Sequence, residues 1–203
     1  MEGAPKVRAT VLNVSIVLVL AAASLWSQTR KTDNSLSPEL ERVRAALEKY
    51  ADPIVAIHDG YFSTLGCADF PYAAKAGHEP YPQGAMGIHF VNPALIGPNP
   101  DPMHPQILLY EPDGGKLRLV GAEWFVPKAA GVDKPPELFG HKFWGPMEGH
   151  EPLQPTGLVH YDLHVWLFKD NPEGLFAPTN PAVKCTGYPY AVEMESTKII
   201  SPK

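Results

Sequence analysis

Residues 106–126 read QILLYEPDGGKLRLVGAEWFV, and this stretch decides the fold because it predicts a β-hairpin. Two apolar runs, residues 106–111 and 116–126, are rich in the aliphatic and aromatic side chains that favour strands. Pro112-Asp113-Gly114-Gly115 joins them, and Asp-Gly between two such runs is among the strongest local signals for a tight hairpin turn. The stretch therefore predicts two neighbouring antiparallel strands.

Two further strands are predicted outward from the hairpin, at residues 85–92 and 158–168, which have the same kind of composition. Residues 66–84 and 129–154 contain so many Pro and Gly that long loops are expected there. Phe139, Phe143 and Trp144 in the second loop indicate that it packs against the rest of the domain.

A helix is predicted upstream, with Ser37 as its N-cap and Pro38 as its first residue. Apolar residues then follow the i, i+3, i+4, i+7 spacing of one helix face, and a kinked continuation past Pro53 towards Tyr61 is expected. Together these patterns predict an α+β fold: an N-terminal helix packed on a curved antiparallel sheet, with long Pro-rich loops.

The composition indicates one domain and excludes nucleic acid as an expected partner. The chain has 203 residues, 44% of them hydrophobic, and a net charge of -5. Its Lys and Arg residues are scattered, so no basic stripe is available to neutralise a phosphate backbone. We expect a single globular domain over residues 37–203, preceded by a polar tether over residues 28–36.

Residues 1–27 have the pattern of a signal peptide. Lys6 and Arg8 precede a nearly continuous apolar run, and the small residues Ala21, Ala22 and Ala23 offer a cleavage site. An uncleaved membrane anchor is the alternative, since the run approaches the minimum length for a transmembrane helix. Either reading predicts an extracytoplasmic protein, periplasmic or secreted, that touches the membrane only through a retained leader.

Cys67 and Cys185 are the two cysteines of the chain, and both follow the leader. In an oxidising compartment such an isolated pair most simply forms a disulfide bond. Metal thiolates or a redox pair are less well supported, because the spacing is not that of a CxxC motif.

Polar side chains occupy one face of the strand predicted at residues 158–168. Alternate residues of a strand share a face, so His160, Asp162, His164 and Trp166 point to one side. The opposite face is apolar and is expected to be buried. The polar face therefore requires a functional or structural explanation.

Three residues on three predicted strands form a candidate metal site: His89, Glu123 and His164. Two His and one carboxylate are a ligand set for iron, manganese or zinc that leaves positions open for water or a substrate. Small residues at Ala85 and Gly87 are expected to leave space beside His89. His160 and Asp162 are predicted to support the ligands by hydrogen bonds. Hydrolytic or oxygen-dependent chemistry would follow if the protein is an enzyme, which the sequence leaves open together with any catalytic residue.

Other interpretations of these residues remain open. A strand histidine is more often a hydrogen-bonded core residue than a ligand. Glu123 could instead face solvent, or pair with Arg118 or a lysine. The remaining histidines are expected in solvent, although His141 and His150 could cap a pocket; this set is His58, His78, His104, His141 and His150.

A non-enzymatic binding module is the main alternative function. Its pocket for a small apolar or sugar-like ligand would be lined by aromatic residues, the candidates being Phe90, Tyr110, Trp124, Trp144 and Trp166. A structural envelope protein without a pocket is the third reading.

Several strings carry a resemblance over about residues 50–185: GIHFVNP from Gly87, LLYEP from Leu108, LVGAEW from Leu119 and LHVW from Leu163. With the later Asn-Pro pairs and Cys185, they resemble a family of exported bacterial proteins of unknown function. The resemblance implies export and brings no activity, cofactor or fold with it.

Overall fold

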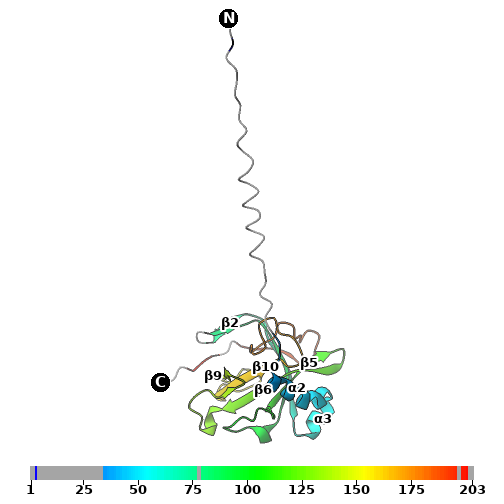
Figure 1. Ribbon diagram of the computed structural model, residues 1–203, viewed down its shortest axis with the longest axis vertical. Helices are drawn as coiled ribbons and strands as arrows, with labels where there is room; N and C mark the ends of the chain where they lie inside the picture. Colours follow the sequence, from blue (N-terminus) through cyan, green and yellow to red (C-terminus); the bar gives the residue numbers. More distant parts are fainter. Residues whose placement is uncertain (1–2, 4–33, 77–78, 196–197, 201–203) are drawn as a thin grey trace. The chain divides into compact units, whose positions relative to one another are not determined.

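The computed structural model describes Gly3 and residues 34–76, 79–195 and 198–200 (Figure 1). The predicted leader, except Gly3, most of the tether, and His78 lie outside the described residues. Among the described residues, no helix combines the length and apolar character needed to cross a membrane.

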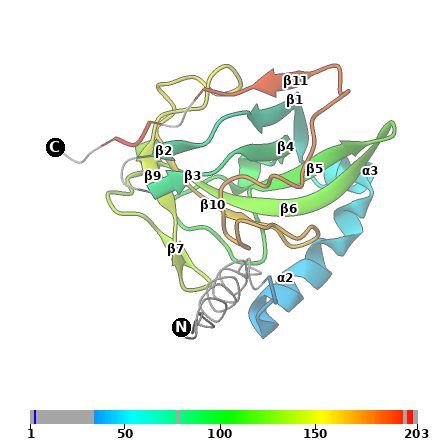
Figure 2. The ribbon, with the colours of Figure 1, turned by 90° about the horizontal axis from the view of Figure 1, so that it is seen from above.

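A seven-stranded sheet organises residues 62–193, and its strand order is β11-β1-β4-β5-β6-β10-β9. All neighbouring strands are antiparallel except β1 and β11, which are parallel. The long strands bow, so the sheet is curved (Figure 2). The strands are β1 Phe62–Phe70, β4 Gly84–Val91, β5 Ile107–Asp113, β6 Lys116–Pro127, β9 Trp144–Met147, β10 His160–Val165 and β11 Ala191–Glu193.

The predicted hairpin is confirmed as β5 and β6, although its turn is shifted by one residue. Asp113 pairs with Lys116, so the two-residue loop is Gly114-Gly115. Both glycines have positive φ, 56° and 83°, the left-handed conformation that tight hairpin turns require. Glycine adopts it without the steric cost that a Cβ would bring.

The first helix begins as predicted. α2 spans Pro38–Leu47, and the Leu40 amide donates to the Ser37 hydroxyl at 3.2 Å. The expected kinked continuation is wrong, because a 3₁₀ turn, η1 Glu48–Ala51, follows and the chain then starts a separate helix, α3 Pro53–His58. A residue before proline avoids the helical conformation. Asp52 is accordingly extended, and its carboxylate accepts from the Ile54 amide at 2.9 Å to cap α3.

The two regions predicted as loops contain short strands. Residues 66–84 include most of β1 and a small hairpin, β2 Ala74–Ala76 with β3 Glu79–Tyr81. β1 was missed because its apolar alternation is interrupted where the register shifts between Ser63 and Cys67 and Leu65 has a φ of 65°. Residues 129–154 include the end of η3 Lys128–Ala130, the pair β7 Glu137–Leu138 and β8 His141–Lys142, and β9. The predicted packing of this region is seen at Phe143, which is 3% exposed.

One main hydrophobic core joins helix and sheet residues. It includes Leu40, Val43 and Leu47 of α2 together with Leu108 of β5 and Leu163 of β10. A second cluster lies on β1, β3 and β4 and the segment after β11, and consists of Ala68, Phe70, Tyr81, Met86 and Met194. The α+β class with a curved, mostly antiparallel sheet is therefore confirmed.

The disulfide is present as predicted. It joins Cys67 on β1 to Cys185 in the segment before β11, with 5.6 Å between the Cα atoms. Because disulfides persist mainly in oxidising compartments, this bond indicates an extracytoplasmic location.

Candidate metal centre

The polar face of β10 is fully buried. His160, Asp162 and His164 are 0%, 2% and 1% exposed, and they alternate along the strand with apolar residues of the main core. Their partners on β6 are Pro127, Phe125 and Glu123. A buried polar face of this kind is costly unless its members are paired or bind a ligand.

The register of four strands brings the three predicted ligands together. Val91, Ile107, Glu123 and His164 form one row across β4, β5, β6 and β10. Paired residues share a face of the sheet. His89 lies two residues before Val91 on β4, so it projects from the same face one step along the strand.

The three side chains converge within the range of a single ion. Glu123 Oε2 lies 3.4 Å from His89 Nε2 and 3.5 Å from His164 Nε2, and one ligand atom from each residue lies within 4.8 Å of the others. Two ligand atoms about 2.1 Å from one ion and about 110° apart are separated by about 3.4 Å. The two distances to Glu123 Oε2 are close to this separation.

Several buried atoms of this group have no hydrogen-bond partner among the described residues. They are Glu123 Oε2 and both ring nitrogens of His164. Each buried polar group left without a partner costs about 1–3 kcal/mol. Arg118 does not form an ion pair with Glu123, because Arg118 pairs with the exposed Asp113 at the hairpin turn. His164 thus lacks, among the described residues, the hydrogen bonds that a core histidine usually makes.

A small cavity opens beside these ligands. It has a volume of about 30 Å³, enough for a water-sized occupant. The lining combines polar and apolar residues and includes His89, Glu123, His150, Asp162, His164, Ala68, Met86, Leu153 and Met194.

The expectation that Gly87 leaves space beside His89 is wrong. Gly87 has a φ of 87°, and a Cβ there would lie 2.5 Å from the Tyr110 carbonyl oxygen of β5. Gly121 likewise permits the Val165 carbonyl oxygen to approach, at 2.6 Å from a hypothetical Cβ. Both glycines allow neighbouring backbone to pack closely, and the cavity lies elsewhere, against Ala68, Met86 and Met194.

A second group adjoins the first: His150, His160 and Asp162, all buried, also offer ligand atoms within 4.8 Å of one another. The predicted supporting hydrogen bonds are not formed among the described residues, since Asp162 Oδ1 lies 3.9 Å from His164 Nδ1. Asp162 Oδ2 is closer to His160 Nε2, at 3.6 Å. His160 and Asp162 thus belong to this neighbouring group.

His150 is the residue that sequence reasoning underestimated. It is 6% exposed and lines the cavity, which overturns its assignment to solvent and agrees with the alternative that it caps a pocket. His58, His104 and His141 are exposed, as expected. The signal available in the sequence was the packing of its Pro-rich loop, which the aromatic residues of that loop already indicated.

Burial and charge shift the pKa values of the second group in opposite directions. Burial lowers the pKa of His150 to about 4, so its ring is neutral at pH 7. Burial would also lower the pKa of His160, but its contact with the Asp162 carboxylate outweighs burial and raises it. Burial likewise favours a higher pKa for Asp162, yet the contact with His160 and the charges nearby lower it. Both shifts favour charge on His160 and Asp162 when no cation is bound.

The aromatic residues proposed for a ligand pocket are mostly core residues. Phe90, Tyr110, Trp124 and Trp166 are at most 2% exposed and belong to the main core. The polar atoms of three of them are satisfied by backbone carbonyls: Tyr110 Oη donates to Tyr50 at 2.6 Å, Trp124 Nε1 to Asp101 at 2.8 Å and Trp166 Nε1 to Ala177 at 2.7 Å. Trp144 is partly exposed, with its ring 6.2 Å from that of Tyr81.

The candidate centre therefore consists of six buried side chains, His89, Glu123, His150, His160, Asp162 and His164, on β4, β6, β10 and the loop before β10. No model of a protein family, no curated protein and no solved structure matches the chain.

Proposed function

We propose that this protein binds a divalent metal ion through His89 Nε2, His164 Nε2 and Glu123 Oε2. The observation that carries the proposal is the convergence of these atoms, at 3.4 and 3.5 Å from the shared carboxylate oxygen, in a buried site. A cation at their centre would supply the partner that Glu123 Oε2 and His164 Nε2 lack among the described residues.

The charge of the site supports a cation. Glu123 and Asp162 are both 2% exposed, and no Lys or Arg is among the described residues that line the cavity. Removing two carboxylates from water without positive charge costs several kcal/mol. A divalent ion would place positive charge beside both carboxylates.

Among zinc, iron and manganese we propose zinc, because the 3.4 and 3.5 Å distances to Glu123 Oε2 are close to the ~3.4 Å expected around a four-coordinate ion. Four-coordinate zinc with two His, one Glu and a water is a familiar catalytic ligand set. A six-coordinate ion would bring adjacent ligands to about 3.0 Å, since its angles are about 90° and its bonds about 2.1 Å. A cavity of about 30 Å³ adjoins the three ligands, so we propose that water or another small molecule would be the exchangeable ligand of a bound ion.

We also propose that the protein works outside the cytoplasm, exported by the leader over residues 1–27. The disulfide between Cys67 and Cys185 supports this location. The strings around His89, Leu108, Leu119 and Leu163 support it as well, through their resemblance to exported bacterial proteins.

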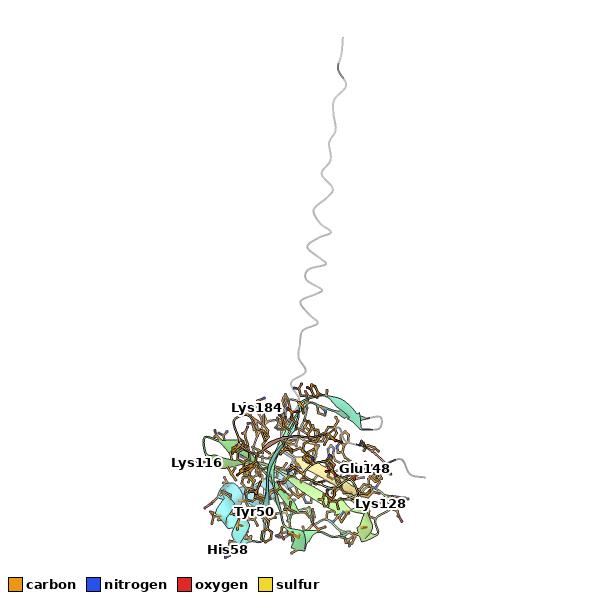
Figure 3. The ribbon with its side chains drawn as sticks, turned by 180° about the vertical axis from the view of Figure 1, so that it is seen from behind. Tyr50, His58, Lys116, Lys128, Glu148 and Lys184 are labelled. Carbon is orange, nitrogen blue, oxygen red and sulfur yellow. A yellow bond between two sulfur atoms is a disulfide. The ribbon has the colours of Figure 1, made fainter. Side chains whose placement is uncertain are left out.

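Metal analysis of the purified full chain tests the proposal. The protein is prepared without chelator, and its metal content and thermal midpoint are compared with those of His164→Ala and of the control His58→Ala. His58 is 87% exposed and projects from the edge of the molecule (Figure 3). We expect the metal content and the rise in midpoint on adding Zn²⁺ to be reduced in His164→Ala and unchanged in His58→Ala.

Should His164→Ala not fold, His89→Gln replaces it, because His89 is less deeply buried. Wild-type protein that carries no metal after exposure to Zn²⁺, Fe²⁺ or Mn²⁺ would refute the proposal. So would an unchanged Zn²⁺ response in both His164→Ala and His89→Gln.

A further inference from the structure

We propose that a second divalent cation binds beside this cavity, held by His150, His160 and Asp162, so that the protein has a two-metal centre. The inference extends the proposed function, because the second ion lies beside the first, but its ligands are different residues. The three side chains are 6%, 0% and 2% exposed, and one ligand atom from each lies within 4.8 Å of the others.

His160 is oriented as a metal ligand in advance. A carbonyl oxygen only accepts, so the 2.9 Å contact to Leu158 O requires Nδ1 to carry a proton and donate it. In the neutral ring Nε2 then carries a lone pair, and this atom is buried without a hydrogen-bond partner among the described residues. Phe125 stacks on the ring, with 4.8 Å between centroids and 27° between planes. A carbonyl on one ring nitrogen and a metal on the other is the usual arrangement of ligating histidines.

Asp162 lies between the two groups of ligands. Its Oδ2 is 3.6 Å from His160 Nε2, and its Oδ1 is 3.9 Å from His164 Nδ1. Oδ1 is buried and has no hydrogen-bond partner within the described ranges. The Asp162 carboxylate can therefore bind the second ion through Oδ2, while its Oδ1 faces the ligands of the first ion.

His150 completes the group from the loop between β9 and β10. Its ring lies 5.2 Å from the His160 ring and 6.0 Å from the Phe70 ring. The loop is closed by a hydrogen bond from the Gln154 amide to the His150 carbonyl at 2.8 Å. Gly149 allows this closure, because a Cβ there would lie 2.0 Å from the Pro155 carbonyl oxygen. The loop thereby holds His150 in the wall of the cavity that His89, Glu123 and His164 also line.

The competing description is an ion pair between protonated His160 and Asp162, with His150 as a neutral neighbour. That description needs only one metal ion per chain. Counting bound ions therefore separates it from a two-metal centre.

The experiment strips the full chain with chelator, titrates it with Zn²⁺ and counts bound ions by elemental analysis after gel filtration. We expect two ions per wild-type chain and two for the control His58→Ala. We expect one ion for His150→Ala and one for His89→Ala, because each variant removes one ligand set. His150→Gln is used in parallel, so that the result does not depend on the folding of one variant.

A wild-type count of one ion would overturn the second site if His89→Ala abolishes binding and His150→Ala does not. A wild-type count of one ion, abolished by His150→Ala and retained in His89→Ala, would overturn the proposed function and support the second site. A count of two that persists in both His150→Ala and His150→Gln would also overturn the second site, since the second ion would then be adventitious.

Proximity of the two ions is tested with Mn²⁺ as the probe. The electron spins of two neighbouring Mn²⁺ ions interact, and this interaction broadens and splits the electron paramagnetic resonance spectrum. We expect such a spectrum from wild-type protein saturated with Mn²⁺. His150→Ala should show the six-line signal of an isolated ion. A six-line signal alone from fully loaded wild-type protein would overturn the two-metal centre.

Discussion

Glu123 on β6 and His164 on β10 are cross-strand partners, and Glu123 Oε2 lies 3.5 Å from His164 Nε2. The backbone of the sheet sets this pairing, so the two side chains are brought together whether or not their contact is favourable. Both atoms are buried without hydrogen-bond partners among the described residues, which makes the pair costly in the absence of a cation.

Glu123→Gln should have opposite effects on stability with and without metal. In chelator we expect the free energy of unfolding to stay level or rise by about 1–3 kcal/mol, because a buried charge is removed. In excess Zn²⁺ we expect the variant to be less stable than wild type, since binding free energy is lost. Urea unfolding under both conditions measures this.

Glu137→Gln is the matched control for that substitution, because Glu137 is exposed on β7. Its stability should follow wild type in both conditions. Equal loss of stability for Glu123→Gln with and without Zn²⁺ would show that Glu123 has only a structural role.

Gly87→Ala should destabilise the protein and weaken metal binding. The new Cβ would lie 2.5 Å from the Tyr110 carbonyl oxygen, at a φ of 87° that alanine adopts at a cost. Strain of this kind costs about 1–3 kcal/mol. Metal binding should weaken because His89 lies two residues later on the same strand and would be displaced with it.

Gly97→Ala is the corresponding control, because no atom from elsewhere in the described part of the chain lies within 4 Å of a Cβ at that position. Chemical denaturation and Zn²⁺ titration of the two variants check the prediction. Equal behaviour of Gly87→Ala and Gly97→Ala would contradict the close approach of β4 and β5.

Reduction of the disulfide should lower stability substantially. Cys67 and Cys185 are 118 residues apart in the sequence, and closing a loop of that size is worth about 4–5 kcal/mol in the chain-entropy model. The chain contains no other cysteine, so reductant changes this bond alone.

Urea unfolding with and without reductant measures the effect, and the double variant with Ala at both positions should match the reduced protein. A midpoint that does not respond to reductant would mean that the bond contributes nothing to stability.

Trp124→Phe should affect stability and leave metal binding intact. The substitution removes the 2.8 Å hydrogen bond from Nε1 to the Asp101 carbonyl and some core volume, which together cost about 1–3 kcal/mol. Trp144→Phe, at a partly exposed position, should cost less.

Thermal unfolding and Zn²⁺ titration test these two substitutions. Loss of Zn²⁺ affinity in Trp124→Phe without loss of stability would show that Trp124 contributes to metal binding and not only to core packing.

The sequence was informative where a local pattern has a single structural solution. The runs around Gly114-Gly115 predicted the hairpin, because a two-residue turn of this kind joins adjacent antiparallel strands. Ser37 and Pro38 predicted the start of α2, since capping depends on neighbouring residues alone. Strand alternation likewise placed His160, Asp162 and His164 on one face.

Residues without a local pattern were misjudged. β1 contains a register shift and a positive φ at Leu65, so its apolar residues do not alternate regularly. His150 lies in a Pro- and Gly-rich loop whose sequence resembles a solvent-exposed connection. Only the packing of that loop on β1 and β10 shows that its imidazole is buried.

The sequence by itself thus determined the hairpin, the start of the first helix and three candidate ligands on separate strands. Tertiary structure alone decided that His89, Glu123 and His164 meet and that His150 lies beside His160 and Asp162. It also decided that the space beside Gly87 is filled by neighbouring backbone and not by a ligand. The physical reason is that alternation along one strand is local. Cross-strand register and loop docking depend on hydrogen bonds and packing between segments far apart in the chain.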